Sequence, residues 1–489
     1  MRPRKILFVA SEAHPLMKTG GLGDVAGALP AALQALHQDV RLVMPAYRAA
    51  MRRAGNIRIA SLALEEDPHP VRILETTLPG SEVTVWLVDS APHFDRNGNP
   101  YTGPDGHDWP DNPERFSVFA RAVTALALDQ AGLAWRPDVV HCNDWQSGLV
   151  PALLHGLPGR PATVFTIHNL AYQGIFAAEH FWRQKLPGHL WSPEGVEFYG
   201  NLSFIKGGLV YADRLNTVSP TYAREITTPE FGCNLDGLLR ARADRLCGIL
   251  NGADYSVWDP VHDPYLSHHY SAGNLDGKAA NKAALQRETG LPVSAETPVI
   301  GLVGRLAAQK GVDLVLSALP ALLSRPVQTV LLGSGDAQLE QTLKTLAEQY
   351  PDRLHVTIGF SEEFAHRIEA GADLFLMPSR YEPCGLNQIY SLRYGTLPVV
   401  RRTGGLADTV VDASDGPRRA TGFVFSDPSP EALLEALSRA LALYRRPRAW
   451  RRLQRNAMAQ DFSWANSARN YLKLYERSLS QKPAPPEPV

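Results

Sequence analysis

The sequence predicts an α/β protein built from two doubly wound domains, and three observations carry this prediction. The chain has 489 residues and is 44% hydrophobic, whereas a single core usually stops growing at about 250 to 300 residues. Short β-branched runs alternate with helical patterns in the first half, and the alternation restarts near residue 299. Such alternation is typical of parallel sheets covered by helices on both faces. We therefore expect two facing domains, with ligands beyond the carboxyl ends of the strands.

The strand candidates of the first half are continuous apolar runs separated by helical patterns. Runs without polar alternation favour strands that are buried on both faces of a parallel sheet. They are residues 6–10, 40–44, 83–88, 138–141, 163–168 and 214–218.

The second half repeats this order of strand and helix. Strands are predicted at 299–303, 329–332, 354–358 and 373–377. Helices are predicted at 311–323, 337–349, 362–370, 386–394, 430–444 and 464–479. The turn-rich sequence NGADYSVWDPVHDP, near 251–264, marks the boundary between the domains. The Pro-rich end, 481–489, is predicted to be a disordered tail.

Charge and cysteine usage exclude several classes of protein. There are 49 Lys and Arg against 50 Asp and Glu, so nothing general favours binding to nucleic acid. Cys142, Cys233, Cys247 and Cys384 form no CxxC pair, which argues against a zinc knuckle or a disulfide framework and fits the reducing cytoplasm. The first apolar run stops before Glu12, too short for a secretory signal, and no run of about 18 apolar residues predicts a membrane span.

The first strand leads into KTGGLGDVAGALP, residues 18–30. This segment fits the dinucleotide pattern loosely, but the second strand, VRLVMPAY, lacks the terminal acid that a nicotinamide ribose requires. Glycines such as Gly20 and Gly21 at a helix start let backbone N–H groups approach a diphosphate, and Lys18 adds a positive charge. A tight turn carrying a solvated lysine is the alternative.

The second domain has a matching segment, GRLAAQKG, where its first strand ends. Arg305 and Lys310 follow that strand closely, and a planar guanidinium beside a mobile ammonium suits two phosphate groups. The GxxxxGK[ST] spacing of a Walker loop is missing. Two solvated surface charges are the alternative.

Two further segments follow later strands of this domain. In SRYEPCGLNQIYSLRYG, Glu382 lies in a turn before a helix, where its carboxylate can contact a ligand at the strand's carboxyl end; an acid favoured at a helix start is the alternative. RRTGGLADT, residues 401–409, is a second glycine-rich helix start that is able to receive phosphate oxygens.

Polar residues also end two strands of the first domain. His168 ends ATVFTIHN and Asp144 ends DVVHCND, each at the edge where a parallel sheet binds its ligands. A lone histidine is more often a satisfied core residue. No GxSxG elbow, HExxH helix or cysteine cluster is present, which removes the simplest hydrolase and metalloprotease interpretations. The loop at 95–113, with Tyr101 and Trp109, is long enough to be functional or mobile.

Several motifs together give the chain a family resemblance over nearly all of residues 5–480. It resembles the ADP-glucose-type glycogen and starch synthases, retaining glycosyltransferases of the GT-B architecture, in which two Rossmann-like doubly wound domains face each other across a deep cleft. The resemblance depends on KTGGLGDVAGALP, DWPDNPERF, HCNDWQSGLVP, TIHNLAYQG, NTVSPTYAREI, GILNGADYSVWDP, GRLAAQKG, ADLFLMPSRYEPCGLNQIYSLRYGTLPVVRRTGGLADTV and TGFVF.

The resemblance implies transfer of glucose from ADP-glucose to the nonreducing end of an α-1,4-glucan with retention of configuration. Residues 1–253 are then the domain on the glucan acceptor side, and 254–457 the domain on the nucleotide-sugar donor side. Residues 458–480 form a terminal helix that crosses back to the first domain. Closure of the domains is expected to keep water from the activated glucose.

The resemblance also assigns roles to residues of this chain. As catalytic residues it implies Lys18, His168, Arg305, Lys310 and Glu382. His168 contacts the transferred glucose, Glu382 lies at the donor sugar, and Phe360 lies beside adenine. The remaining positions that match donor-binding positions are Gly20, Gly21, Asp144, Asn251, Cys384, Gly385, Leu386, Thr403, Gly404, Gly405 and Leu406.

Three features depart from the family pattern: Gly23 stands where Ala is usual, HCNDWQ replaces an HxHDWH-like segment, and Asn387 replaces a common Thr. They bear on donor and acceptor preference more than on reaction class. We expect no metal or other cofactor, because cations and helix starts can bind the donor phosphates. Retention by a covalent carboxylate intermediate and retention by same-face attack both remain possible chemically, and the resemblance favours the second. A GT-B nucleotide-sugar epimerase and a noncatalytic glucan-binding protein are the alternative functions.

Overall fold

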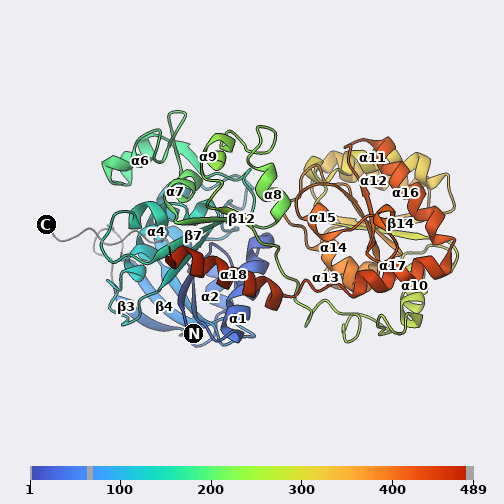
Figure 1. Ribbon diagram of the computed structural model, residues 1–489, viewed down its shortest axis with the longest axis horizontal. Coiled ribbons are helices and arrows are strands. Elements are labelled where there is room, and N and C mark those ends of the chain that lie inside the picture. Colours follow the sequence, from blue (N-terminus) through green and yellow to red (C-terminus); the bar gives the residue numbers. More distant parts are fainter. Residues whose placement is uncertain (1–2, 63–69, 481–489) are drawn as a thin grey trace. The chain divides into compact units, whose positions relative to one another are not determined.

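The computed structural model describes residues 3–62 and 70–480, and the chain divides into two compact units (Figure 1). Unit 1 comprises the described parts of Met1–Val218, Ala223–Gly252 and Trp464–Val489, and unit 2 comprises Ser219–Tyr222 and Ala253–Ser463. In Figure 1, unit 1 is coloured blue to green with the red helix α18 (Trp464–Ser480), and unit 2 yellow-green to red-orange. The tail predicted at 481–489 lies outside the described residues.

Two details of the division differ from the predicted domains. Residues 219–222 belong to unit 2, because Ser219 Oγ donates a hydrogen bond to Pro383 O (2.7 Å) and Thr221 Oγ1 donates one to Asp408 Oδ1 (2.7 Å). Residues 458–463 also stay with unit 2, and the change back to unit 1 comes at Trp464. The sequence pattern did not predict the hydrogen bonds of Ser219 and Thr221, because their partners are far apart from them along the chain.

Unit 1 is built on a nine-stranded sheet in the order β12-β11-β7-β6-β1-β2-β5-β4-β3. Its strands are β1 (Lys5–Val9), β2 (Asp39–Pro45), β3 (Arg58–Leu62), β4 (Arg72–Thr77), β5 (Thr84–Asp89), β6 (Val139–Asn143), β7 (Ala162–Ile167), β11 (Arg214–Thr217) and β12 (Leu246–Gly248). The sheet is parallel from β12 to β5, as predicted, but β3, β4 and β5 pair antiparallel. The tight turn that joins β4 to β5, with Gly80 at φ 79°, is too short for a parallel crossover, which needs a dozen or more residues.

Helices cover the sheet of unit 1, which also contains a small three-stranded sheet with the strand order β8-β10-β9. The small sheet consists of β8 (Ile175–Ala177), β9 (Glu197–Phe198) and β10 (Asn201–Ser203). The helices are α1 (Gly21–Ala35), α2 (Arg48–Arg53), α3 (Ala91–Phe94), α4 (Asn112–Ala127), η1 (Trp145–Ser147), α5 (Leu149–Leu154), α6 (Glu179–Arg183), η2 (Gly188–Leu190), α7 (Phe204–Tyr211), α9 (Asp236–Ala241) and α18 (Trp464–Ser480). Helix α8 (Pro220–Glu225) spans the division, since its first three residues belong to unit 2 and the rest to unit 1.

Unit 2 contains a six-stranded sheet that is parallel throughout, in the order β15-β14-β13-β16-β17-β18. Its strands are β13 (Val299–Val303), β14 (Gln328–Gly333), β15 (Leu354–Ile358), β16 (Leu374–Met377), β17 (Leu397–Arg401) and β18 (Phe423–Phe425). Its helices are α10 (Asp276–Glu288), η3 (Ala308–Lys310), α11 (Val312–Leu323), α12 (Ala337–Gln349), α13 (Glu362–Gly371), α14 (Asn387–Tyr394), α15 (Gly404–Thr409), η4 (Ala413–Asp415), α16 (Pro430–Tyr444) and α17 (Pro447–Met458).

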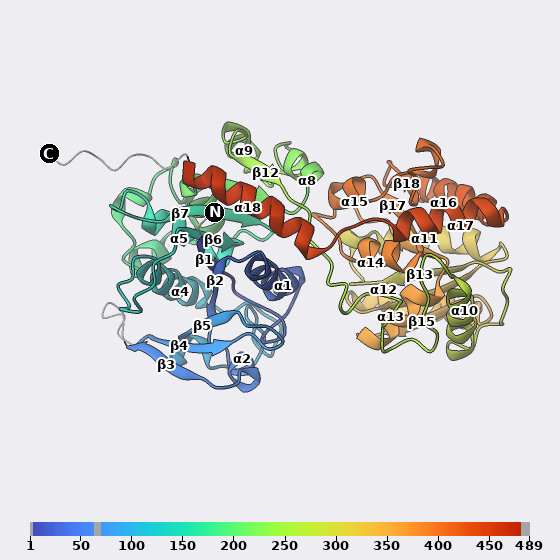
Figure 2. The ribbon, with the colours of Figure 1, turned by 60° about the horizontal axis from the view of Figure 1, so that its bottom comes forward.

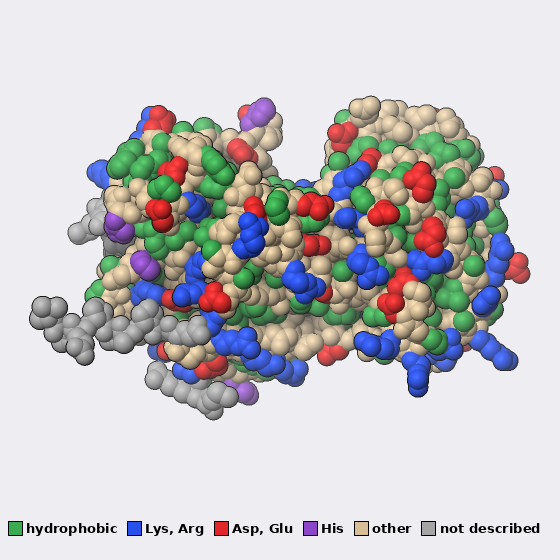
Figure 3. Space-filling model, turned by 45° about the horizontal axis from the view of Figure 1, so that its top comes forward, with side chains coloured by type: hydrophobic (Ala, Val, Ile, Leu, Met, Phe, Trp, Pro, Cys, Tyr) green, Lys and Arg blue, Asp and Glu red, His purple; other side chains and the backbone are tan. Residues whose placement is uncertain are grey.

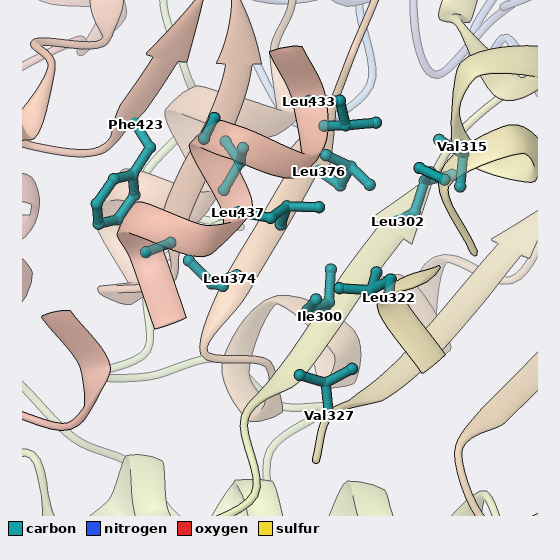
Figure 4. Packing of buried hydrophobic residues seen from close by; sticks show 14 of the residues in the cluster. Ile300, Leu302, Val315, Leu322, Val327, Leu374, Leu376, Phe423, Leu433 and Leu437 are labelled. Carbon is teal, nitrogen blue, oxygen red and sulfur yellow. The ribbon is translucent and has the colours of Figure 1, made fainter. Parts of the chain in front are cut away.

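A continuous apolar core joins the strands of unit 2 to the helices on one face of its sheet (Figure 4). Ile300 and Leu374 project from neighbouring strands, and Leu322 of α11 and Leu437 of α16 pack on them. The sequence analysis missed α17, because RPRAWRRLQRNAM is rich in arginine. Its buried face is nevertheless apolar apart from Gln454, and Trp450 belongs to this core. Arg, Ala, Leu, Gln and Met are also good helix formers, so both intrinsic propensity and burial of that face explain why the segment forms a helix.

The last helix, α18, packs in unit 1 against α1 and β7, and Figure 2 shows it in red along the blue and teal elements. His141, in the middle of β6, joins it to the sheet. Its Nδ1 lies 2.8 Å from Tyr475 Oη of α18, and its Nε2 lies 2.7 Å from Thr166 Oγ1 of β7. The ring is fully buried, and burial lowers the pKa of His141 from 6.5 to about 3.

This burial predicts a pH dependence of stability. Between about pH 3 and pH 6.5 the unfolded chain binds a proton at His141 that the folded chain excludes, so acid favours unfolding. We expect the free energy of unfolding to fall by about 1.4 kcal/mol per pH unit below 6.5 from this residue alone. His141→Gln should be less stable at pH 7.5 but should lose less on acidification. Urea unfolding of both proteins at pH 7.5, 6.0 and 5.0 measures this, and parallel losses would contradict it.

Positive and negative side chains are interspersed over the face shown in Figure 3, in agreement with a formal net charge of -1. Among the helices in residues 3–62 and 70–480, none combines the length and the apolar character that crossing a membrane requires.

Candidate functional site

In each unit, charged residues follow the two strands at which the strand order reverses. In unit 1 the chain proceeds from β1 to β2 on one side and places β6 on the other; in unit 2, β13 lies between β14 and β16. Ligands of doubly wound sheets bind at this reversal, beyond the carboxyl ends of the strands. Lys18 and Asp144 follow β1 and β6, and the segment with Arg305 and Lys310 and the turn with Glu382 follow β13 and β16. The main candidates predicted from the sequence therefore follow the strands at which the strand order reverses.

The turn between β1 and α1 is fixed by Glu12, which the sequence analysis did not single out as a site residue. The Glu12 side chain is buried, and its Oε2 accepts hydrogen bonds from the backbone N–H groups of Thr19 and Gly20, the latter at 3.4 Å. Its Oε1 accepts from Thr19 Oγ1 and Tyr101 Oη, each at 3.0 Å. Of the glycine N–H groups that were predicted to approach an anion, that of Gly20 is therefore already bound to a carboxylate of the chain, as is that of Thr19 before it.

Lys18 itself is exposed, and its Nζ lies 2.6 Å from Asp24 Oδ1 in the first turn of α1. A Cβ built on Gly20 or Gly21 would meet nothing within 4 Å, whereas one built on Gly23 would lie 3.1 Å from Lys18 Cγ. The first two glycines thus leave open space at the helix start, and Gly23 gives the lysine stem room.

Asp144, Asn143 and His168 form a connected group at the ends of β6 and β7. Asp144 Oδ1 accepts a hydrogen bond from His168 N (2.7 Å), and His168 Nε2 lies 2.9 Å from Asn143 Oδ1. Asp144 adopts φ 55° and ψ 178°, a region that residues with a side chain rarely occupy. Strained backbone at a strand end is typical of functional sites, because the surrounding structure must hold it.

Desolvation sets the charges of this group. It lowers the pKa of His168 to about 3, so the imidazole is neutral near pH 7 and acts as a hydrogen-bonding group. It raises the pKa of Asp144 to about 7, and the negative charge of Glu12 adds to the rise. Since the charge of Glu12 raises the pKa of Asp144, the turn after β1 and the end of β6 belong to one electrostatic environment.

Asn251 follows β12, at the far end of this run of strands. It is 6% exposed, and its Oδ1 has no hydrogen-bond partner among the described residues. Strands β11, β7 and β6 stand between β12 and β1 in the sheet.

In unit 2, Lys310 and Glu382 form a close ion pair. Lys310 Nζ lies 2.5 Å from Glu382 Oε2, and Ser379 Oγ donates a hydrogen bond to the same oxygen at 3.1 Å. Glu382 is 6% exposed, whereas Lys310 keeps part of its side chain in contact with solvent. The end of β16 thus carries a nearly buried carboxylate, that of Glu382. The segment after β13 carries a cation, that of Lys310, which can turn toward solvent.

Backbone contacts join the two turns that carry this pair. Arg380 N donates to Gln309 O at 2.8 Å, and the Arg380 guanidinium lies 2.5 Å from Asp313 Oδ2. Asn387 Nδ2, at the start of α14, donates to Val303 O at the end of β13 (2.8 Å). Arg305 is exposed and forms no ion pair in the part of the chain that the structure describes, so its guanidinium remains available to an anion.

The glycines of RRTGGLADT pack against the Glu382 turn. A Cβ on Gly404 would lie 2.0 Å from Glu382 O, and one on Gly405 would lie 2.1 Å from Cys384 O. Gly405 N donates to Glu382 O (3.1 Å) and to Pro383 O (3.2 Å). This N–H group is therefore already satisfied by the chain, and the glycines shape the turn that holds the Glu382 carboxylate.

We predict that Gly404→Ala lowers the free energy of unfolding by at least about 3 kcal/mol and reduces turnover. Gly404 has φ 41°, and its missing Cβ is where Glu382 O stands, so backbone strain and overlap add together. Gly290→Ala is the matched control, because Gly290 has φ 72° with nothing within 4 Å; it should cost about 1 kcal/mol. Equal losses in urea unfolding would show that the close packing is unimportant.

The other predicted donor residues of unit 2 lie along the same edge of its sheet. Cys384 is buried, Gly385 has φ 72°, and Leu386 is the residue before α14. Thr403 and Leu406 are buried around the start of α15. Phe360 follows β15, two strands from β13, and is 85% exposed; such a ring is free to stack on a flat ligand.

Glu12, Asn143 and Ser379 were not predicted as site residues. Glu12 is the third residue after β1, Asn143 is the last residue of β6, and Ser379 is the second residue after β16, so position relative to the strands was the available signal. Within the described residues, no group of three or more His, Cys, Asp or Glu side chains is arranged to hold a metal ion.

Comparisons with known proteins agree with this arrangement. Residues 5–241 match the family model described as the starch synthase catalytic domain, and residues 288–457 match that of glycosyl transferases group 1. Over 482 residues the chain is 58% identical to a glycogen synthase of Thioalkalivibrio sulfidiphilus, with 97% of this chain and 100% of the relative covered. The chain belongs to the glycogen and starch synthase family. It is a glucosyltransferase with nucleotide-sugar and glucan substrates.

Other relatives extend this result. Glycogen synthase 2 of Nitrosococcus oceani is 55% identical, with 98% of each chain covered. The catalytic domain of starch synthase IV from Arabidopsis thaliana, solved bound to ADP and acarbose, matches with a TM-score of 0.87 at 32% identity, covering 98% of this chain and 100% of that one. A sucrose-phosphate synthase from Thermosynechococcus elongatus shares the fold, with a TM-score of 0.59 at 19% identity and coverage of 98% and 99%. The predicted GT-B architecture of two α/β domains is confirmed.

Proposed function

We propose that this member of the family transfers glucose from ADP-glucose to the nonreducing end of an α-1,4-glucan, with retention of configuration, and so elongates glycogen. The observation that carries the proposal is the Lys310–Glu382 pair, 2.5 Å apart at the strand reversal of unit 2. Such a pair offers a cation to the departing diphosphate and a carboxylate to the sugar.

The first step is cleavage of the bond between glucose C1 and the β-phosphate oxygen. Negative charge then develops on ADP, and preorganised cations that meet it lower the barrier. We assign this role to Lys310 and Arg305, with Lys18 acting on the same donor. Because Lys310 is already held by Glu382, and Ser379 holds that carboxylate in turn, little reorganisation is needed at the moment of reaction.

Glucose acquires oxocarbenium character as the leaving group departs, and we assign Glu382 to stabilise and orient it. In the same-face route the glucan 4-hydroxyl attacks C1 on the side from which ADP leaves, and the hydroxyl proton passes to the departing phosphate oxygen. Glu382 then remains a carboxylate throughout. Neutral His168 donates or accepts a hydrogen bond to the glucose hydroxyls, Phe360 stacks on adenine, and the turns at Cys384–Leu386 and Thr403–Leu406 shape the donor site; Asp144 and Asn251 supply polar contacts.

We propose that no metal takes part, because three protein cations supply the positive charge that a divalent ion would otherwise bring to the phosphates. Initial rates measured with and without EDTA, after dialysis against the chelator, should agree within about twofold. A loss that added Mg²⁺ or Mn²⁺ restores would overturn this assignment. The four free cysteines fit a reducing compartment, and we place the reaction in the cytoplasm.

Incubation of the purified chain with radiolabelled ADP-glucose and glycogen tests the proposed function. Label should enter the precipitable polymer and should be released by an enzyme specific for α-1,4 linkages. UDP-glucose in parallel assays measures the donor preference, and Glu382→Gln serves as the inactive reference. Conversion of the nucleotide-sugar without glucan would indicate an epimerase. Retention on glycogen without incorporation of label would indicate a noncatalytic binding protein, and either result would reject the proposal.

A further inference from the structure

Glu12 is a buried carboxylate whose hydrogen-bond partners are all donors. It is 3% exposed. One oxygen accepts from the backbone N–H groups of Thr19 and Gly20, and the other accepts from the hydroxyls of Thr19 and Tyr101. An ionised carboxylate is acceptor-only, so this set of partners fits the charged form.

Within residues 3–62 and 70–480, no Lys, Arg or His forms an ion pair with Glu12; the nearby Lys18 pairs with Asp24 instead. Burial raises the pKa of the Glu12 carboxyl group. A buried charge without a counter-ion is costly, and a packed apolar side chain is often a more stable alternative. The fold of β1 and α1 therefore gains little from an acid at this position, and a role in the turn that it holds is the better explanation.

Thr19 and Gly20 connect Lys18 to the start of α1 at Gly21. When Glu12 holds both of their N–H groups, it fixes the chain direction immediately after Lys18. It also keeps these two amides from binding phosphate. Because Gly23 N donates to Gly20 O (3.1 Å), the N–H groups of Gly21 and Leu22 are the ones left for that purpose at the start of α1. The carboxylate thus determines both the position of Lys18 and which backbone N–H groups remain available to bind phosphate.

The long loop noted at 95–113 supports Glu12 from the other side. Tyr101 Oη lies 2.8 Å from Ser11 Oγ as well as 3.0 Å from Glu12 Oε1. The Tyr101 ring contacts Phe116 of α4 and Trp145 of η1, with ring centroids 6.3 Å and 6.4 Å away. Through Tyr101, the loop therefore connects Glu12 to helix α4 and to the short helix η1.

We propose that Glu12 is a positioning residue for the donor diphosphate: it holds the Thr19–Gly20 backbone so that Lys18 and the first turn of α1 meet the phosphates. This inference rests on the proposed function, since it names a further residue of the same donor site. Glu12 contacts the turn and not the donor, so it acts through Lys18.

A double-mutant cycle between Glu12 and Lys18 tests the proposal. Glu12→Met keeps the length of the side chain and removes its acceptors, and Lys18→Ala removes the cation. We expect Glu12→Met to lower kcat/KM for ADP-glucose by about 30-fold or more. In that background Lys18→Ala should cost less than about threefold further, because a misplaced lysine contributes little. Losses that simply multiply would show that Glu12 is only structural and would overturn the inference.

Glu12→Gln separates charge from geometry. Its amide oxygen can accept from the N–H groups of Thr19 and Gly20, while its NH₂ donates to the Thr19 and Tyr101 hydroxyls, which can turn to accept. We expect a loss in kcat/KM of less than about fivefold, and a loss as large as that of Glu12→Met would contradict the positioning role. If Glu12→Met does not fold, Glu12→Asp, which shortens the reach, replaces it in the cycle.

Glu369 is the matched control. It is another buried glutamate, 2% exposed, on α13 of unit 2, with Ser391 donating to it. The effects of Glu369→Gln and Lys18→Ala on kcat/KM should multiply within about twofold, and coupling there would mean that the cycle reports general destabilisation. The same cycle is measured in ADP Kd by calorimetry. If the wild type binds ADP without transferring glucose, the proposed function fails, and the Kd cycle still decides the role of Glu12.

Discussion

Replacement of Glu382 by Gln is expected to lower kcat by about 10²- to 10³-fold while the Kd for ADP changes less than about threefold. The side chain has 6% exposure and is held by Lys310 and Ser379, so the amide should occupy the same place. What is lost is the negative charge opposite a developing oxocarbenium ion, a contribution that exists only in the transition state. Steady-state kinetics and ADP calorimetry on the same preparation measure the two quantities.

Two results would contradict this role for Glu382. Turnover near that of the wild type would show that the carboxylate does not stabilise the transition state. A large loss of ADP affinity would show that it supports the nucleotide site instead. Urea unfolding of the variant shows whether any loss of turnover reflects folding, since Lys310 loses its ionic partner in Glu382→Gln.

Replacement of Lys310 by Met should lower kcat/KM for ADP-glucose by about 10²-fold or more. Its ammonium is placed 2.5 Å from Glu382, and methionine keeps most of the stem while removing the charge that meets the departing diphosphate. A donor with a better leaving group needs less assistance from this cation. The loss should therefore be smaller when the reaction is run with a glucosyl donor whose leaving group is a weaker base.

Arg367→Met is the matched control for Lys310→Met. Arg367 also pairs with carboxylates, those of Glu363 and Glu288, but these pairs lie at the surface of α13 and α10. Exposed ion pairs contribute little to stability, so the kcat/KM of Arg367→Met for ADP-glucose should remain within about twofold of the wild-type value. An unchanged kcat/KM in Lys310→Met would remove the proposed phosphate contact, whatever the control shows.

Much of the fold follows from local patterning. The apolar runs that became β1, β2, β5, β6, β7, β11, β13, β14 and β16 are largely buried, and burial on both faces gives a continuous apolar run that is visible in the sequence. The predicted strand β15 is only partly buried. Other segments were not predicted: β12, β17 and β18, the strands β3 and β4 of the antiparallel edge, and α17 with its arginine-rich outer face. For β3 and β4, tertiary pairing overrides a weak local preference.

The candidate site shows the same division. Lys18, His168, Arg305, Lys310 and Glu382 were predicted as site residues because each follows a buried strand, where ligands of doubly wound sheets bind. The sequence did not indicate that Lys310 and Glu382, 72 residues apart, form a pair. Nor did it indicate that Gly404 and Gly405 pack on the Glu382 turn. Such contacts depend on the alignment of neighbouring strands, which no local pattern specifies.

By itself, the sequence determined the α/β class, the repetition of a doubly wound pattern, the strand ends that carry charge and the family to which the chain belongs. Only the tertiary structure decided that Glu12 accepts hydrogen bonds from the backbone N–H groups after Lys18 and that His141 links α18 to the sheet through a hydrogen bond. It also decided at which glycines a neighbouring backbone atom lies where a Cβ would be. Hydrophobic periodicity is a property of single segments, whereas hydrogen bonds and close contacts between distant segments exist only once the strands have taken their order in the sheet.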